Sequence, residues 1–355
     1  MSVLFSPLTL RGLTVRNRVW VSPMCQYSSD KGKPTDWHLV HLGSFARGGA
    51  GLVLTEATAV SPEGRISPWD AGIWTDEQAD AYRRITSFVH GQGAAAGVQL
   101  AHAGRKGSTR RPWEGHGSVP SNEGGWQTVA PSPIAFGDFD APKELAETEL
   151  AGVVADFGAA AVRADAAGFD VVEVHAAHGY LLHQFLSPLA NHRADRYGGD
   201  LAGRSRLLLE VVEAVRDAWP EDKPLFVRLS ATDWAEGGWG LEETVEVARR
   251  LAEAGVDLVD VSSGGAVPWQ AVEVGPGYQV PFARAVREGA GVPTAAVGLV
   301  TEPAQAEDIV ASGAADAVLL ARAVLRDPHW ALRAADELGA GDGLWPRQYL
   351  RARLS

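Results

Sequence analysis

The chain has 355 residues, of which 46% are hydrophobic and 21% charged, and its formal net charge is −12. These values allow a large core and argue against nucleic acid or an anionic membrane surface as a partner. No apolar run reaches the roughly 18 residues of a membrane span, and the N-terminus lacks the basic and apolar segments of a secretory signal. Cys25 is the only cysteine, which excludes an internal disulfide and a cysteine-ligated cluster and favours a cytoplasmic location.

Short apolar runs alternate with longer amphipathic stretches along the chain. The apolar runs predict strands over residues 18–23, 51–57, 95–100, 170–174, 224–229, 258–261, 294–297 and 317–320. The amphipathic stretches predict helices over residues 37–47, 76–92, 147–167, 201–219, 241–254, 279–288, 301–312 and 324–338. Strand–helix units repeated in this way predict an α/β fold, a (β/α)8 TIM barrel that forms one domain over residues 1–355. An open, doubly wound sheet is the alternative, but no Gly-x-Gly-x-x-Gly follows the first strand.

The connection after the third predicted strand, about residues 104–145, is rich in Gly, Pro, Ser and Trp. A loop of this length in a compact domain is usually functional, so we expect a lid over the C-terminal end of the barrel. The charged run over residues 193–200 is expected to be a structural network that steadies the loop after the fourth strand.

The fourth strand runs into His175-Ala-Ala-His178-Gly179-Tyr180. Imidazole N–H groups can polarise a substrate carbonyl, and a phenol can deliver a proton to the carbon beside it. A pair of metal ligands, or polar loop residues without a catalytic role, is the alternative interpretation. An iron site made with Glu173 is disfavoured because that residue lies in the interior of the strand.

The other strand ends carry residues suited to a phosphorylated planar ligand. Gln99 and Arg228 offer donors and a fixed positive charge, and such a charge beside an electron-rich ring stabilises the reduced form of a flavin. Gly298 and the pair Ala321-Arg322 follow the last two strands, where barrels commonly bind phosphate. His38, His41 and His102 are expected to be structural.

Together these motifs resemble those of the Old Yellow Enzyme family of FMN-dependent ene-reductases, specifically its thermophilic-like subclass. The resemblance covers nearly the whole chain and is most specific in four segments: Ser-Pro-Met-Cys-Gln-Tyr27, Gln-Leu-Ala-His-Ala-Gly-Arg105, His-x-x-His-Gly-Tyr180 and residues 185–200. It implies a barrel that binds FMN noncovalently at its top. It also implies an enzyme that takes hydride from NADPH, or NADH, and reduces the activated C=C bond of small α,β-unsaturated carbonyl or nitro compounds.

The resemblance also implies roles for individual residues. It assigns to FMN the contacts of Ser22, Pro23, Met24, Cys25, Ala57, Gln99, Arg228, Gly298, Ala321 and Arg322. His175 and His178 hold the substrate oxygen in this resemblance, and Tyr180 is the proton donor. Cys25 adjusts the flavin potential, and Tyr27 reaches the substrate. The resemblance implies no metal site.

The C-terminal tail, about residues 345–355, resembles a segment that joins neighbouring subunits. Arg351 resembles a residue that crosses into the neighbouring active site, which implies a homodimer or a tetramer built from dimers. Arg353 is the alternative, because the chain ends differently from many relatives. Ala321 is a second departure, since most members carry glycine there.

Two other functions are left open by the sequence. One is an FMN-dependent reductase or oxidase of another electrophilic substrate, and the other is a flavin-binding protein without enzymatic activity. A barrel oxidase of 2-hydroxy acids is disfavoured because Gly298-Leu-Val300 stands where that class needs a His-Arg pair.

Overall fold

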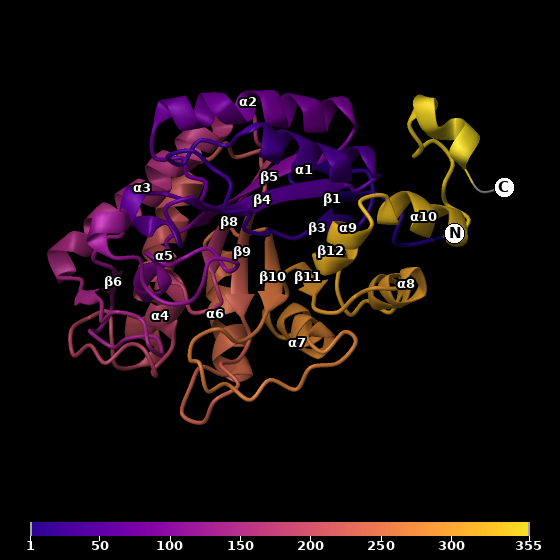
Figure 1. Cartoon of the computed structure of the whole chain (residues 1–355). Coiled ribbons are helices and arrows are strands. Elements are labelled where there is room, and N and C mark those ends of the chain that lie inside the picture. The colour runs from indigo at the N-terminus through magenta and orange to yellow at the C-terminus, as the bar shows by residue number, and fades with distance from the viewer. Residues whose placement is uncertain (1, 354–355) are drawn as a thin grey trace.

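The computed structural model describes residues 2–353, and its centre is a closed barrel of parallel strands (Figure 1). The strands follow one another around the barrel in chain order, and the last is hydrogen-bonded to the first. They are β3 (Val19–Val21), β4 (Leu52–Ala59), β5 (Ala95–Ala101), β8 (Val171–Ala176), β9 (Leu225–Ser230), β10 (Leu258–Ser262), β11 (Thr294–Val297) and β12 (Ala317–Leu320). Each lies where the sequence predicts a strand, so the (β/α)8 barrel is confirmed.

The N-terminal end of the barrel is closed by apolar side chains. A hairpin of β1 (Leu8–Leu10) and β2 (Leu13–Val15), which the strand pattern did not predict, covers this end. Its Leu10 and Val15 belong to the same buried cluster as Trp20 and Phe226, whose rings stack with centroids 5.7 Å apart. Because this end is packed with hydrocarbon, polar chemistry is left to the opposite, C-terminal end.

Amphipathic helices cover the outside of the barrel (Figure 1). They are α1 (Asp36–Arg47), α2 (Asp76–Gly91), α3 (Glu147–Ala166), α5 (Leu201–Ala218), α6 (Leu241–Glu253), α7 (Val280–Ala290) and α8 (Pro303–Ala311). In α6, the buried residues are Thr244, Val247, Ala248 and Leu251, the spacing of one helical face. These helices agree with the predicted ranges to within two residues at most ends.

Two features differ from the predicted helices. The predicted helix over residues 324–338 is wrong as a single element, because the structure has α9 (Arg322–Arg326) and α10 (Trp330–Glu337) instead. Pro328 lies in the break, where its missing N–H and its ring disfavour a continuous helix. A short helix that was not predicted, α4 (Leu181–Leu186), follows Tyr180 directly and is fully buried.

The segment over residues 104–145 lies on the barrel as irregular chain with two short strands, β6 (Val129–Ala130) and β7 (Lys143–Glu144). Arg193, from the charged run after α4, donates Nη1 hydrogen bonds to the carbonyls of Pro131 (3.2 Å) and Leu145 (2.5 Å). Arg105 donates to the carbonyls of Ile134 (3.1 Å) and Ala266 (2.7 Å). Two buried guanidinium groups therefore fix this segment to the rest of the barrel.

Within residues 2–353, no helix combines the length and the apolar character needed to cross a bilayer.

Candidate active site

His175, His178 and Tyr180 lie together at the C-terminal end of β8. His175 is inside the strand, and the other two are in the turn that follows it. The centroid of the His175 ring is 5.2 Å from that of His178 and 5.0 Å from that of Tyr180. The structure thus brings these three predicted residues into one cluster.

The protonation states of this cluster follow from its contacts. The backbone N–H of Ala177 donates to Nδ1 of His175 (3.3 Å), so the neutral ring carries its hydrogen on Nε2. Nε2 of His178 lies 2.7 Å from Oγ of Ser262. Burial, and then the charge of Arg228, hold the pKa of both histidines well below the ordinary value, while burial raises the pKa of Tyr180. At neutral pH the cluster therefore consists of two neutral imidazoles and one phenol O–H.

Cys25 faces this cluster from the loop after β3. Its side chain and that of Tyr180 pack against one small apolar group that contains Ala57 and Ala101. Burial is the main reason that the pKa of Cys25 is raised, so the residue is a thiol. Tyr27 adopts a left-handed backbone with φ of +52°, and its ring meets the edge of Trp113 at a centroid distance of 5.7 Å.

A buried contact between a histidine and a carboxyl group supports the loop that carries Cys25. Nε2 of His38 lies 2.9 Å from Oε1 of Glu56, and Oε2 of Glu56 accepts the backbone N–H of Gln26 (3.0 Å). His38 is thus structural, as the sequence suggested. His102 is likewise buried, and its Nδ1 accepts the backbone N–H of Gly104 (3.1 Å).

Gln99 and Arg228 project from β5 and β9, and two carboxyl groups lie behind them that the sequence did not identify as partners. Nε2 of Gln99 donates to Oε1 of Glu173 (2.8 Å). Nε of Arg228 lies 3.0 Å from Oδ2 of Asp260. All four residues are at least nine-tenths buried. One cation therefore faces two buried acids.

Burial and the mutual repulsion of the two acids raise the pKa of Glu173, and burial raises the pKa of Asp260. Because Asp260 lies against the guanidinium of Arg228, we assign the negative charge to Asp260 and the shared proton to Glu173.

The state of Glu173 predicts a pH dependence of stability. The folded chain keeps a proton that the unfolded chain loses above the ordinary pKa of 4.5, so this group lowers the free energy of unfolding as pH rises toward neutrality. Glu173→Gln removes that effect, and its stability relative to the parent should therefore increase between pH 5 and 7, by up to about 1.4 kcal/mol per pH unit. Urea unfolding of the apoprotein of both proteins between pH 5 and 7 measures this. A difference in the free energy of unfolding that stays constant or falls with pH would contradict the assignment of the proton to Glu173.

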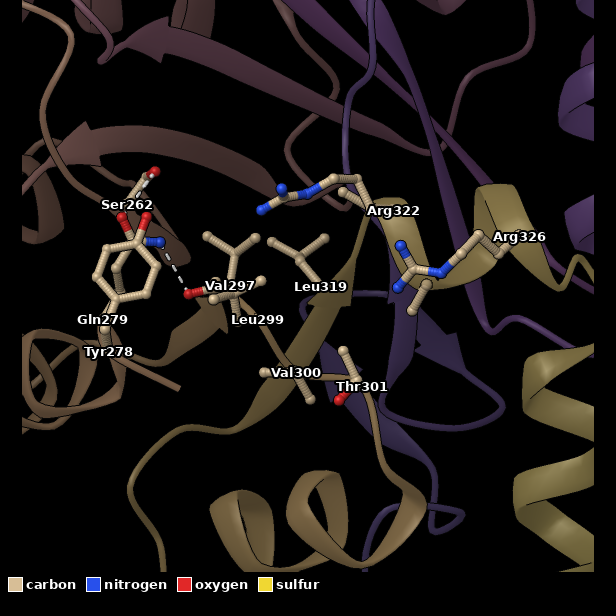
Figure 2. Close-up of a pocket in the computed structure, with 13 residues that line it drawn as sticks. Ser262, Tyr278, Gln279, Val297, Leu299, Val300, Thr301, Leu319, Arg322 and Arg326 are labelled. Carbon is tan, nitrogen blue, oxygen red and sulfur yellow. Dashed lines mark hydrogen bonds between the residues drawn. The ribbon is translucent and has the colours of Figure 1, made fainter. Parts of the chain in front are cut away.

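A cavity of about 220 Å³ opens beside the ends of β10, β11 and β12 (Figure 2). Arg322 and Arg326 of α9 line one side of it, and Ser262 and Gln279 line the other. Neither arginine forms an ion pair with another of residues 2–353. Ser262, which lines the cavity, is also the residue whose Oγ lies 2.7 Å from Nε2 of His178, so it separates the cavity from the histidine cluster.

Two residues that line this cavity, Gly298 and Ala321, have unusual backbone dihedral angles. Gly298 has φ of +115°, and a Cβ at this position would lie 2.6 Å from Nε2 of Gln279, so glycine is required. Ala321 has φ of −116° and ψ of −94°, which is not the left-handed region that favours glycine but also lies outside the main allowed regions.

The donor set of this end of the barrel fits an FMN. Guanidinium groups suit a phosphate, and Gln99 and Arg228 offer donors and a positive charge to the pyrimidine side of a flavin ring. Ser22, Pro23 and Met24 follow β3 on the same end, as predicted.

The two C-terminal arginines lie in different surroundings. Arg353 forms ion pairs with Asp336 (3.1 Å) and Asp342 (2.9 Å) of its own chain. Arg351 is exposed in a short 3-10 helix over Arg347–Ala352, and among the described residues no side chain pairs with it. Residues 354 and 355 of the predicted tail lie outside the described residues.

Comparisons with known proteins identify the family of the chain. The NADH:flavin oxidoreductase / NADH oxidase family matches residues 3–340. An NADPH dehydrogenase of Listeria monocytogenes serotype 4b (strain CLIP80459) is 48% identical over 356 residues, 99% of each chain. Another, of Geobacillus sp. (strain WCH70), is 47% identical over 341 residues, 95% of each chain.

Solved structures show the same likeness. Morphinone reductase has a TM-score of 0.79 at 29% identity, with 96% of this chain and 90% of that one covered. The Old Yellow Enzyme homologue of Zymomonas mobilis has a TM-score of 0.77 at 27% identity, with 99% and 98% covered. A 2-naphthoyl-CoA reductase, with a TM-score of 0.85 at 25% identity, is longer, and this chain spans 53% of it. The chain therefore belongs to the NADH:flavin oxidoreductase / NADH oxidase family, as one of its Old Yellow Enzyme-like members.

Proposed function

We propose that this FMN-dependent NAD(P)H oxidoreductase reduces the activated C=C bond of α,β-unsaturated carbonyl or nitro compounds, with NADPH as its donor. The observation that carries the proposal is the cluster of two neutral imidazoles and one phenol O–H at the end of β8. The names of the relatives from Listeria and Geobacillus support NADPH as the donor.

FMN binding is assigned to residues on the ends of several strands. Arg322, with the backbone of Gly298 and Ala321, takes the phosphate, and Arg228 and Gln99 take the pyrimidine side of the ring. Ser22, Pro23, Met24, Cys25 and Ala57 complete the pocket. When bound, FMN supplies the hydride that reduces the alkene, after accepting it from the nicotinamide.

The side chains of the cluster then divide the chemistry between them. Nε2–H of His175 and the ring of His178 hold the substrate oxygen and draw electron density toward it, which leaves the β carbon open to hydride. Tyr180 gives its proton to the α carbon. Burial raises the pKa of this phenol, so Tyr180 carries the proton at neutral pH. Cys25, a neutral thiol, adjusts the flavin potential, and Tyr27 contacts the substrate from the lid side.

Substrate-oxygen binding by the histidines predicts a loss of phenol affinity. Phenols are oxygen ligands that stack on an oxidised flavin and give a charge-transfer band. His175→Ala or His178→Ala should raise the Kd for p-hydroxybenzaldehyde by about tenfold or more, since each removes a hydrogen bond to an anionic oxygen. A titration followed at the charge-transfer band measures this.

The control for that titration is His90→Ala. His90 is a half-exposed histidine whose Nε2 lies 2.7 Å from Oδ2 of Asp170, at the opposite end of β8. Its variant should bind the phenol as the parent does. A parent-like Kd in both site variants would remove the histidines from the substrate site.

Assembly completes the proposed site. Arg351 is the better candidate for a residue that reaches a neighbouring subunit, because Arg353 is already paired within its own chain. We therefore propose a homodimer, or a tetramer built from two dimers, in which Arg351 contributes to the partner's pocket.

Arg351→Ala should raise KM for the alkene and leave the rate of flavin reduction unchanged, because a lost wall contact affects substrate binding alone. Arg353→Ala, the matched variant, should affect the stability of the tail instead. Steady-state kinetics of both variants distinguish them, and the reverse pattern would assign the crossing role to Arg353.

A further inference from the structure

The turn that carries His178 and Tyr180 has an unusual backbone. His178 and Gly179 have φ of +58° and +72°, a left-handed conformation that is uncommon for residues other than glycine. Gly179 packs directly on Gly265, since a Cβ at Gly179 would lie 2.0 Å from the carbonyl oxygen of Gly265. The orientation of the peptide between His178 and Gly179 therefore decides where the side chains of His178 and Tyr180 point.

A buried histidine from α4 holds that peptide. The backbone N–H of Gly179 donates to Nδ1 of His183 (2.8 Å), and Nε2 of His183 lies 3.0 Å from Oδ1 of Asp233. Oδ2 of Asp233 accepts from Oγ of Ser187 (2.6 Å) and from the backbone N–H of Trp239 (2.9 Å). The side chains of His183 and Asp233 are 0% exposed.

The contacts define the tautomer of His183. Because Nδ1 accepts a hydrogen bond, the neutral ring carries its hydrogen on Nε2, facing Asp233. Burial raises the pKa of Asp233, but the neighbouring His183, Ser187 and Trp239 together bring it below the ordinary value, so the group is a carboxylate. The carboxylate lies against Nε2 of the ring, and Nδ1 of the ring accepts the hydrogen bond from the Gly179 peptide.

We propose that His183 is a positioning residue, supported by Asp233, that aims His178 and Tyr180 at the substrate by holding the peptide between them. The inference rests on the proposed function, in which these two side chains act on the alkene. His183 is fully buried and so does not itself touch the substrate. Arg228 and Arg322, assigned to FMN, lie on other elements, so a loss of His183 should spare the flavin.

Two substitutions separate the contacts of His183. In His183→Asn, the amide oxygen can replace Nδ1 as the acceptor for Gly179, but the side chain is too short to reach Asp233. In His183→Gln, the amide N–H can still reach Asp233, so the buried carboxylate keeps a donor, while Gly179 loses its acceptor. The control is His90→Gln, which alters the half-exposed His90–Asp170 pair at the other end of the same strand.

The experiment uses the FMN-loaded protein and measures three quantities. Hydrogen exchange of the Gly179 amide should be about tenfold or more faster in His183→Gln than in the parent. The Kd for p-hydroxybenzaldehyde should rise, and the reoxidation rate with 2-cyclohexenone should fall, each by about tenfold or more, because small displacements of catalytic groups are costly. Flavin reduction by NADPH should stay within about twofold in all variants, and His183→Asn should recover most of the loss.

Several outcomes would overturn the proposal. These are unchanged phenol binding and exchange in a folded His183→Gln, equal losses in both half-reactions, or an Asn variant no better than the Gln variant. If His183→Gln does not fold, His183→Leu combined with Asp233→Asn removes the acceptor for Gly179 without leaving a buried unpaired carboxylate and provides the same three readouts, and parent-like values there would equally contradict the proposal. A parent enzyme that fails to reduce the enone contradicts the proposed function instead, while exchange and phenol binding still decide the role of His183.

Discussion

Tyr180→Phe is expected to slow the reoxidation of reduced enzyme by 2-cyclohexenone by about 100-fold or more, because a positioned general acid contributes about 10²–10⁴-fold. The substitution removes one oxygen and keeps the ring that packs against His175 and the small apolar group around Cys25. Reduction of the flavin by NADPH involves no proton from this phenol and should keep its parent rate. Stopped-flow absorbance of each half-reaction, recorded anaerobically, measures the two rates separately.

The matched variant for this comparison is Tyr82→Phe. Tyr82 is a fully buried tyrosine on α2, and its hydroxyl lies 3.4 Å from Oγ1 of Thr58. Tyr82→Phe should leave the rates of both half-reactions near those of the parent. An equal loss of both rates in Tyr180→Phe, or a parent-like reoxidation rate, would remove Tyr180 from the role of proton donor.

Arg228→Met is expected to have the largest effect on both stability and FMN affinity. It leaves the carboxylate of Asp260 buried without its cation, and breaking a buried pair from one side costs about 3–5 kcal/mol. It also removes the fixed positive charge assigned to the flavin. Urea unfolding of the apoprotein measures the first effect, and fluorescence titration with FMN measures the second.

Two further variants separate these effects. Arg228→Met combined with Asp260→Asn should recover stability but not FMN affinity, because the unpaired charge is gone while the flavin contact is still missing. Arg287→Gln breaks a more exposed pair with Asp316 (2.9 Å) and should cost about 1 kcal/mol or less. If Arg228→Met bound FMN as the parent does, the pyrimidine side of the site would have to be assigned elsewhere.

The sequence predicted the barrel because each buried strand is a continuous apolar run between amphipathic helices. In β8 and β9 every residue is buried, and the polar side chains that the sequence identified, such as His175 and Arg228, lie toward their C-terminal ends. Parallel strands place those ends on one side of the barrel, so residues far apart in the chain could be assigned to one site. For this reason the histidine cluster and Cys25 could be assigned to one site from the sequence.

Other features depend on contacts that no local pattern encodes. Asp233 and His183 are 50 positions apart, and nothing near either residue indicates that they meet. The pairing of Asp260 with Arg228 depends on the register of β9 against β10, which the sequence does not specify. The short helix α4 is buried on all sides, its polar residues His183 and Gln184 included, so it shows no amphipathic pattern. The break between α9 and α10, by contrast, had a signal in Pro328 that the helical pattern around it obscured.

The most direct test of the proposed function is an anaerobic absorbance experiment on the purified protein. NADPH is added until the flavin band bleaches, and 2-cyclohexenone is then mixed in with oxygen still excluded. We predict that the band returns as the enone is reduced to cyclohexanone. A band that returns only when oxygen is admitted would contradict reduction of the C=C bond, and a protein that neither contains nor binds FMN would contradict the assignment of the site itself.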